Sequence, residues 1–238
     1  MKIFSKYTLR LFDWFLILGA LTFNILYAIL TNEFDIIGTI ASVTGVVCVV
    51  LVAKRSMSNY IFGLINVSLY AYISYESELY GDFLLNALYY LPMQIIGWFM
   101  WMKDRGDIDL QGHTDESIVK SKLMSYNARV ALLILCVVGT VLGGYLLTIY
   151  TGDPQPYKDS ATTVLSVLAM LLMVRKYMEQ WILWVAVNGI SIVMWAFVWV
   201  DGGAHAGLMV IMYLFYLANS INGIIVWNTA ALRNDTSR

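Results

Sequence analysis

Eight stretches of apolar residues, each close to the length of a membrane-crossing helix, constrain this chain more than any other feature of its sequence. A bilayer core of about 30 Å requires roughly 20 apolar helical residues. Hydrophobic residues make up 60% of the chain and charged residues only 13%, which excludes an ordinary soluble domain. The sequence therefore predicts an all-α integral membrane protein with eight transmembrane helices. They cover residues 8–30, 36–53, 60–75, 83–102, 129–150, 160–174, 180–200 and 204–230.

The basic residues predict how these helices are oriented. If the N-terminus lies in the cytoplasm, all 15 lysines and arginines except Lys158 lie on the cytoplasmic side. This is the bias of the positive-inside rule. We therefore expect both termini to be cytoplasmic. The net charge of −1 gives no field that would attract nucleic acid.

The second half of the chain repeats features of the first. An even number of spans separates the two copies, so both enter the membrane in the same orientation, as in carriers built from parallel repeats. We expect an extra N-terminal helix (1–33), a first three-helix repeat (34–102), a cytoplasmic loop with a linker helix (103–155), a second three-helix repeat (156–231) and a cytoplasmic tail (232–238). The copies read Arg55, Asn66, Tyr90, Gly97, Trp101 and Arg175, Asn188, Tyr216, Gly223, Trp227.

Polar and aromatic residues within the spans recur at helical spacing and so form stripes. An amide in hydrocarbon without a partner costs several kcal/mol, so these side chains must face protein, water or a solute. Single amides can serve as glue between helices. Their recurrence on both repeats, together with Trp and Tyr, favours a solute path. The stripes are Asn59, Gly63, Asn66, Tyr70; Asn86, Tyr90, Gln94, Gly97, Trp101; Trp181, Trp184, Asn188, Ser191, Trp195; and Tyr216, Ser220, Gly223, Trp227.

Charged side chains are expected to be rare inside the spans. Apart from Arg10 and Asp13 near the edge of the first span, we place none there, and His205 is the one other titratable candidate. A buried phosphate would need Arg or Lys, so we expect a phosphorylated solute to be rejected. The lack of intramembrane acids argues against strong proton coupling. Facilitated diffusion of a small, neutral or weakly cationic solute is the simplest mechanism.

Other classes of function remain as alternatives. A ligand-gated membrane receptor could also have eight helices. An enzyme is disfavoured because the sequence has no Ser/His/Asp set, paired intramembrane acids or dinucleotide fingerprint. The separate cysteines Cys48 and Cys136 and the two histidines are too few for a metal cluster, so neither a metal nor a cofactor is expected.

Several motifs resemble the PnuC family of bacterial nicotinamide riboside transporters. They are Trp181-Ile182-Leu183-Trp184 with Asn188-Gly189, Gly97-Trp98-Phe99-Met100-Trp101, and Asn219-Ser220-Ile221-Asn222-Gly223. The family is similar to the SWEET sugar carriers, with helices arranged as three, one and three, and it works by facilitated diffusion with trapping by a cytoplasmic riboside kinase. The resemblance implies the bacterial inner membrane. Relatives for thiamine or riboflavin are alternatives, as is a sugar carrier, and a homo-oligomer is left open.

The resemblance also implies a set of substrate-binding residues. Trp184 and Trp181 would contact or gate the solute, while Asn188, Gln94 and Asn66 would bind its carboxamide or ribose. Tyr90, Tyr213, Asn219 and Asn222 are second choices.

Overall fold

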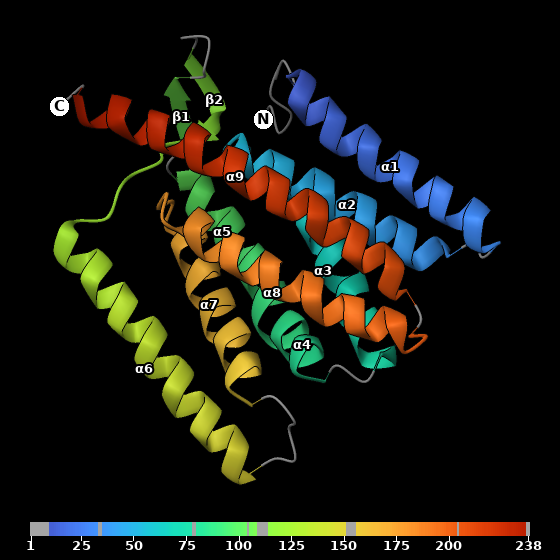
Figure 1. Ribbon diagram of the computed structural model, residues 1–238. Helices are drawn as coiled ribbons and strands as arrows, with labels where there is room; N and C mark the ends of the chain where they lie inside the picture. Colours follow the sequence, from blue (N-terminus) through green and yellow to red (C-terminus); the bar gives the residue numbers. More distant parts are fainter. Residues whose placement is uncertain are drawn as a thin grey trace.

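The computed structural model describes residues 10–32, 35–77, 80–103, 105–108, 114–150, 156–203 and 205–236, and these form a helical bundle with one small hairpin (Figure 1). The fold class expected from the sequence is confirmed, and the helix bounds follow the predicted spans. The helices are α1 (Leu11–Thr31), α2 (Ile36–Ala53), α3 (Asn59–Glu76), α4 (Tyr80–Leu84), η1 (Leu85–Tyr90), α5 (Leu91–Lys103), α6 (Tyr126–Tyr150), α7 (Pro156–Val174), α8 (Gln180–Val200) and α9 (Ala206–Thr236).

Seven helical segments of the described chain are long and apolar enough to cross a membrane. The predicted span 60–75, which is α3, is the exception, although it has 18 residues. Its amide, hydroxyl and tyrosine side chains lower its hydropathy, and it packs along α2 within the bundle. The protein is therefore a multi-pass membrane protein in which α3 relies on its neighbours to cover its polar side chains.

The fourth predicted span is a helix with a π-helical turn in its middle. The segments α4, η1 and α5 follow one another without a break, and the N–H of Leu91 donates to the carbonyl of Asn86, five residues earlier. Pro92 explains this turn, because its ring has no N–H and would collide with a carbonyl in a regular α-helix. Single π turns of this kind occur often at functional sites.

The helices pack in two groups. In one group α2 lies along α3, which contacts α5 and η1, and in the other α8 lies between α7 and α9. The groups meet mainly where α2 packs against α9, and η1 and α5 approach α7. Outside them, α6 packs on α7 and α1 packs on α2 and α9 (Figure 1). This is the packing expected of two three-helix repeats with a linker helix, although the exact repeat boundaries stay a prediction.

The connections α2–α3 and α7–α8 have the same backbone geometry. Arg55 and Lys176 have φ of 62° and 65°, the left-handed conformation that commonly ends a helix. In the first corner Ser56 N–H donates to the carbonyl of Leu51 at 2.9 Å, and in the second Tyr177 N–H donates to that of Leu172 at 2.9 Å. Each corner is a Schellman motif. The same structural motif therefore occurs at two places that are far apart in the sequence. The structure pairs Arg55 with Lys176, one position after the predicted partner Arg175.

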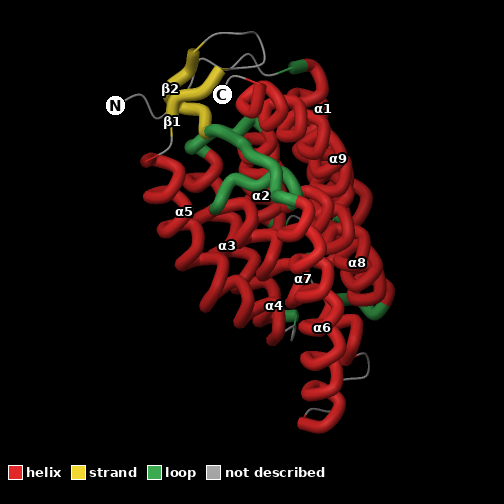
Figure 2. Tube along the Cα trace, turned by 90° about the vertical axis from the view of Figure 1, so that its left-hand side faces the viewer, coloured by secondary structure: helices red, strands yellow, loops and turns green. Residues whose placement is uncertain are grey.

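The hydrophilic loop contains a short antiparallel hairpin that the sequence analysis did not predict, made of β1 (Arg105–Ile108) and β2 (Thr114–Val119). Figure 2 shows it at the end of the bundle where α1 begins, which we call the hairpin end, whereas α4 lies at the opposite end. After β2 the chain crosses both corners. Val119 N–H donates to the Arg55 carbonyl at 3.2 Å, and Lys122 N–H donates to the Lys176 carbonyl at 3.0 Å. We call residues 119–124 the strap.

A buried ion pair fixes α1 at the same end. Lys54 Nζ lies 2.5 Å from Asp13 Oδ2, and both side chains are almost completely buried. Farther along the helix, Asn24 donates to Ser42 Oγ at 3.1 Å. The Arg10 and Asp13 region noted in the sequence is thus a structural attachment of the extra helix.

Candidate functional site

A cavity of about 130 Å³ lies between the two groups of helices. One water molecule needs roughly 10–15 Å³ by this measure, so the cavity has room for about ten waters or a solute of nucleoside size. Its wall combines amides, hydroxyls and aromatic rings with aliphatic and methionine side chains from α2, α3, α4, η1, α5, α7, α8 and α9. Each predicted polar stripe contributes two to four of its residues to this wall.

Seven of the nine predicted site residues line the cavity: Trp184, Asn188, Gln94, Asn66, Trp181, Tyr90 and Tyr213. The structure does not bring Asn219 and Asn222 to its wall. Asn219 is fully buried and its amide donates to the Val49 carbonyl at 2.7 Å, so it joins α9 to α2. Asn222 is half-buried one turn closer to the hairpin end.

Two of the asparagines in the wall are already engaged by protein. The Asn66 amide donates to the Ala41 carbonyl at 2.9 Å and accepts from the Tyr216 hydroxyl at 3.4 Å. The Asn188 amide donates to Ser220 Oγ at 2.9 Å. They hold α2, α3, α8 and α9 together and shape the wall, so a solute that bonded to them would have to share or replace these contacts.

Gln94 and Trp181 differ, because each has a buried polar atom without a partner among the described residues. These atoms are Gln94 Oε1 and Trp181 Nε1. A buried polar atom left unpaired costs about 1–3 kcal/mol. Both residues line the cavity, so this acceptor and this donor are two buried polar atoms beside it that the described residues leave unpaired.

Aromatic rings supply the apolar part of the wall. The rings of Tyr90 on η1 and Trp184 on α8 lie with centroids 6.3 Å apart, at an angle of 50°, on opposite groups of helices. The Tyr213 ring contacts that of Tyr216 at 5.4 Å. Ring faces of this kind can stack on a flat heterocycle, and such stacking contributes about 1–3 kcal/mol per base-sized ring.

The cavity also contains a carboxylate, which corrects the expectation of no acid within the spans beyond Asp13. Asp82 on α4 lines the wall and accepts a hydrogen bond from the Tyr70 hydroxyl at 3.1 Å. The predicted fourth span begins at residue 83 and therefore excludes Asp82. A signal was present, because Asp82, Asn86, Tyr90 and Gln94 follow one another at intervals of four residues.

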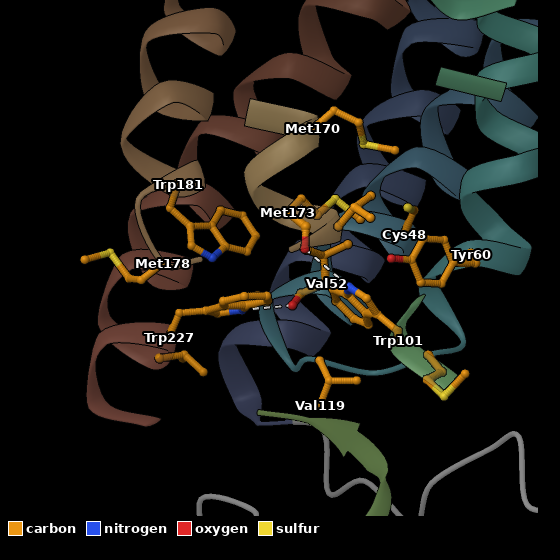
Figure 3. Close-up of a cluster of buried hydrophobic side chains, with 14 of the residues drawn as sticks. Cys48, Val52, Tyr60, Trp101, Val119, Met170, Met173, Met178, Trp181 and Trp227 are labelled. Carbon is orange, nitrogen blue, oxygen red and sulfur yellow. Dashed lines mark hydrogen bonds between the residues drawn. The ribbon is translucent and has the colours of Figure 1, made fainter. Parts of the chain in front are cut away.

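Between the cavity and the hairpin end, a cluster of buried aromatic and methionine side chains closes the bundle (Figure 3). Trp101 on α5 donates to the Met173 carbonyl on α7 at 3.2 Å, and Trp227 on α9 donates to the Val52 carbonyl on α2 at 3.0 Å. The two hydrogen bonds run in opposite directions across the boundary between the groups. Val52 and Met173 each lie three residues before the left-handed residue of their corner, Arg55 and Lys176. The same Trp-to-carbonyl hydrogen bond is therefore made once in each direction. We call the four residues that form these two hydrogen bonds the tryptophan brace.

Two glycines make the brace possible. A Cβ on Gly97 would lie 2.6 Å from the Tyr60 ring, and a Cβ on Gly223 would lie 2.4 Å from the Trp181 ring. Tyr60 in turn packs edge-on against Trp101 with centroids 5.2 Å apart, and Trp181 packs against Trp227 at 6.1 Å. The repeated Gly and Trp positions therefore close the hairpin end and do not contact the cavity.

The opposite end has its own contacts between the groups. Trp195 Nε1 donates to the Tyr70 hydroxyl oxygen at 2.7 Å, and the Tyr213 hydroxyl donates to the same oxygen at 3.0 Å. His205, just before α9, contacts the carboxylates of Asp35 and Glu76. Among the described residues, no group of three or more His, Cys, Asp or Glu side chains could hold a metal ion.

A bundle of membrane-crossing helices around a solute-sized polar cavity, closed at one end by a repeated contact, defines a membrane carrier. Residues 35–229 match the model of the nicotinamide mononucleotide transporter family, and the chain belongs to this family. It is 40% identical over 199 residues to the nicotinamide riboside transporter PnuC of Neisseria mucosa, covering 83% of this chain and 74% of the relative. It is 34% identical over 196 residues to PnuC of Haemophilus influenzae, covering 82% and 80%.

One solved structure, described as the crystal structure of the vitamin B3 transporter PnuC, resembles this fold with a TM-score of 0.82. The two chains are 35% identical, and the likeness covers 94% of each. The family resemblance seen in the sequence motifs is therefore confirmed.

Proposed function

We propose that this protein carries nicotinamide riboside across the membrane by facilitated diffusion. The observation that carries this proposal is the cavity between the two groups of helices. Beside its aromatic rings, Gln94 Oε1 and Trp181 Nε1 have no partner among the residues that the structure describes. A pyridine ring with a carboxamide and a ribose offers stacking faces, donors and acceptors that match such a wall. The relatives named as riboside transporters support the same solute.

The unphosphorylated riboside is favoured over the mononucleotide, although the family description names the latter. No lysine, arginine or histidine belongs to the described cavity wall, whereas Asp82 does. A phosphate would meet a carboxylate and no cation, and like charges at close range are unfavourable in a low dielectric. Phosphorylation by a cytoplasmic riboside kinase would then trap the solute after uptake.

The orientation proposed places the hairpin end in the cytoplasm. The ends of α2, α5 and α7, both corners and the strap carry most of the described basic residues, whereas Lys158 lies at the opposite end. This is the distribution that the positive-inside rule associates with the cytoplasmic face. Residues 1–9 and 237–238, which include further basic residues, lie outside the described part. For a bacterial carrier this orientation corresponds to the inner membrane with both termini inside.

Proteoliposomes test the proposal directly. Purified protein should take up radiolabelled nicotinamide riboside without an imposed gradient, and unlabelled riboside inside the vesicles should accelerate the uptake. In calorimetry the riboside should bind and the mononucleotide should not. Thiamine, riboflavin and simple sugars serve as competing solutes. Equal binding of riboside and mononucleotide would refute the proposed selectivity, and binding without transport would indicate a receptor.

A further inference from the structure

Asp82 brings a negative charge into a cavity whose described wall contains no positive side chain. It sits on α4, at the end of the bundle opposite the hairpin (Figure 2). Ion pairs between described residues include Lys54 with Asp13 and Arg129 with Glu179, and Asp82 takes part in none of them. Asp82 is only partly exposed, and removing a charge from water without a counter-ion has a free-energy cost. A cation that enters the cavity would remove this cost.

The hydrogen bonds around Tyr70 favour an ionised Asp82. The Tyr70 hydroxyl oxygen already accepts from Trp195 Nε1 and from the Tyr213 hydroxyl. An indole N–H can only donate, so the single hydroxyl proton of Tyr70 remains for Asp82 Oδ2, 3.1 Å away. Hydrogen bonds donated to a carboxylate stabilise its charged form. The geometry therefore holds Asp82 as an acceptor.

Asp82 belongs to the same face as the other polar groups of the wall. Asn86 donates to the Asp82 backbone carbonyl at 2.8 Å, and Tyr90 and Gln94 follow on successive turns of the π-interrupted helix. A solute that stacks on the exposed face of Tyr90 or Trp184 would therefore lie along a row that ends in a carboxylate. The aromatic faces and the carboxylate act together on a positive ring, because π faces also attract cations.

We propose that Asp82 is the counter-ion that selects a cationic ring in this cavity. With the solute proposed above, on which the choice of ring rests, it pairs with the pyridinium of nicotinamide riboside. The same carboxylate disfavours solutes that carry a phosphate or carboxylate. Asp82 thus discriminates between solutes by their charge, while the amides and aromatic rings discriminate by their shape and hydrogen-bonding groups.

The test compares two solutes that differ mainly in charge: nicotinamide riboside, a cation, and its 1,4-dihydro form, which is neutral. In calorimetry the Asp82→Asn variant should bind the cation at least about tenfold more weakly than the parent protein. Its affinity for the dihydro form should stay within about twofold. Asp82→Glu, which retains the charge, should recover part of the affinity for the cation. An equal loss for both solutes, or no loss for either, overturns the proposal.

Controls separate this result from misfolding and from other roles of Asp82. Asp201→Asn makes the same substitution at an exposed position that ends α8 at the same end of the bundle, and should change neither affinity. Size-exclusion profiles and circular dichroism verify the fold of each variant. If riboside uptake by the parent protein requires an imposed proton or sodium gradient and Asp82→Asn abolishes this requirement, Asp82 binds that ion and the proposal fails.

A second pair of solutes keeps the inference independent of the proposed function. Thiamine carries a cationic ring and riboflavin a neutral one. If the parent protein binds thiamine but no riboside, the proposed function fails, while a loss of thiamine affinity confined to Asp82→Asn still supports the counter-ion. A parent protein that binds neutral solutes in preference to all cations overturns the counter-ion, whichever solute it transports.

Discussion

At the scale of single residues, the wall of the cavity contains two kinds of amide. Asn66 and Asn188 donate to protein groups, whereas the side-chain oxygen of Gln94 is buried without a partner among the described residues. A stripe in the sequence shows that an amide faces inward but not which hydrogen bonds it makes, because these depend on neighbours from other helices. Seven residues of the wall could therefore be predicted from the sequence. The sequence does not distinguish amides that are hydrogen-bonded to another helix from amides that have an unpaired atom.

This difference leads to a prediction for Gln94→Met, which replaces the amide by an apolar side chain of similar size. The free energy of unfolding should stay the same or rise, because a buried unpaired oxygen is removed. Riboside affinity should fall about 3- to 10-fold, the equivalent of one neutral hydrogen bond. Thermal unfolding in detergent and calorimetry measure the two quantities.

Asn219→Leu is the matched control for Gln94→Met. Asn219 lies outside the cavity wall and its amide donates to the Val49 carbonyl, so the substitution should lower the free energy of unfolding. The loss should be at most about 1 kcal/mol, because the buried unpaired oxygen of Asn219 is removed as well. Riboside affinity should be unchanged. If Gln94→Met destabilises the protein and leaves affinity intact, Gln94 has a structural role.

At the scale of elements, the helices could be predicted and several details could not. Spans were predicted from apolar length, which is decided by local composition, so their bounds agree closely with the structure. The π turn in the fourth span follows from Pro92, but its length depends on packing against α3 and α7. The hairpin has short polar strands without a clear alternation, and its formation depends on the corners that its last residue contacts.

The tryptophan brace gives the prediction at this scale. Trp227→Phe keeps the ring packing but removes the hydrogen bond to the Val52 carbonyl. A hydrogen bond between membrane helices contributes about 0.6–2 kcal/mol, so the population open at the hairpin end should rise about 3- to 30-fold. Cys48, a cavity residue near this end, should react correspondingly faster with a maleimide in a Cys136→Ala background. Trp101→Phe should give the same result.

Trp199→Phe provides the control for the brace, because this tryptophan is exposed near the opposite end of α8. Its Cys48 labelling rate should equal that of the parent. Unchanged labelling in both brace variants would mean that these hydrogen bonds do not hold the hairpin end closed.

At the scale of the whole molecule, the strap joins the two groups of helices mainly through its own backbone N–H groups. Besides the bonds to Arg55 and Lys176, Ser121 Oγ donates to the Trp227 carbonyl at 3.1 Å, and Met124 N–H donates to Glu179 Oε1 at 3.0 Å. Charge and hydropathy predicted that this segment lies outside the membrane. They carried no information on what it contacts, because backbone donors are the same in every residue.

Lys122→Pro tests the strap by removing the N–H that donates to the Lys176 carbonyl. The free energy of unfolding should fall by about 1–3 kcal/mol if the carbonyl stays unpaired. Maleimide labelling of Cys48 should also accelerate, because separating the corners becomes easier. Lys120→Pro places the same ring outside the two corner hydrogen bonds and should have a smaller effect on both measurements. If the strap does not influence closure of the hairpin end, Cys48 should be labelled at the same rate in Lys122→Pro and Lys120→Pro.

The brace has one more consequence, for symmetry. A two-fold dimer of one three-helix unit would form both hydrogen bonds from a single tryptophan and a single carbonyl, because in such an interface each contact is made twice. A single chain that contains both units keeps the two equivalent hydrogen bonds at the closing contacts, but its two halves no longer have to be identical. One half can therefore place Asp82 and a proline-induced turn beside the solute, while the other contributes Trp184 from an unbroken helix. The ring of an asymmetric solute then meets different chemistry on its two sides.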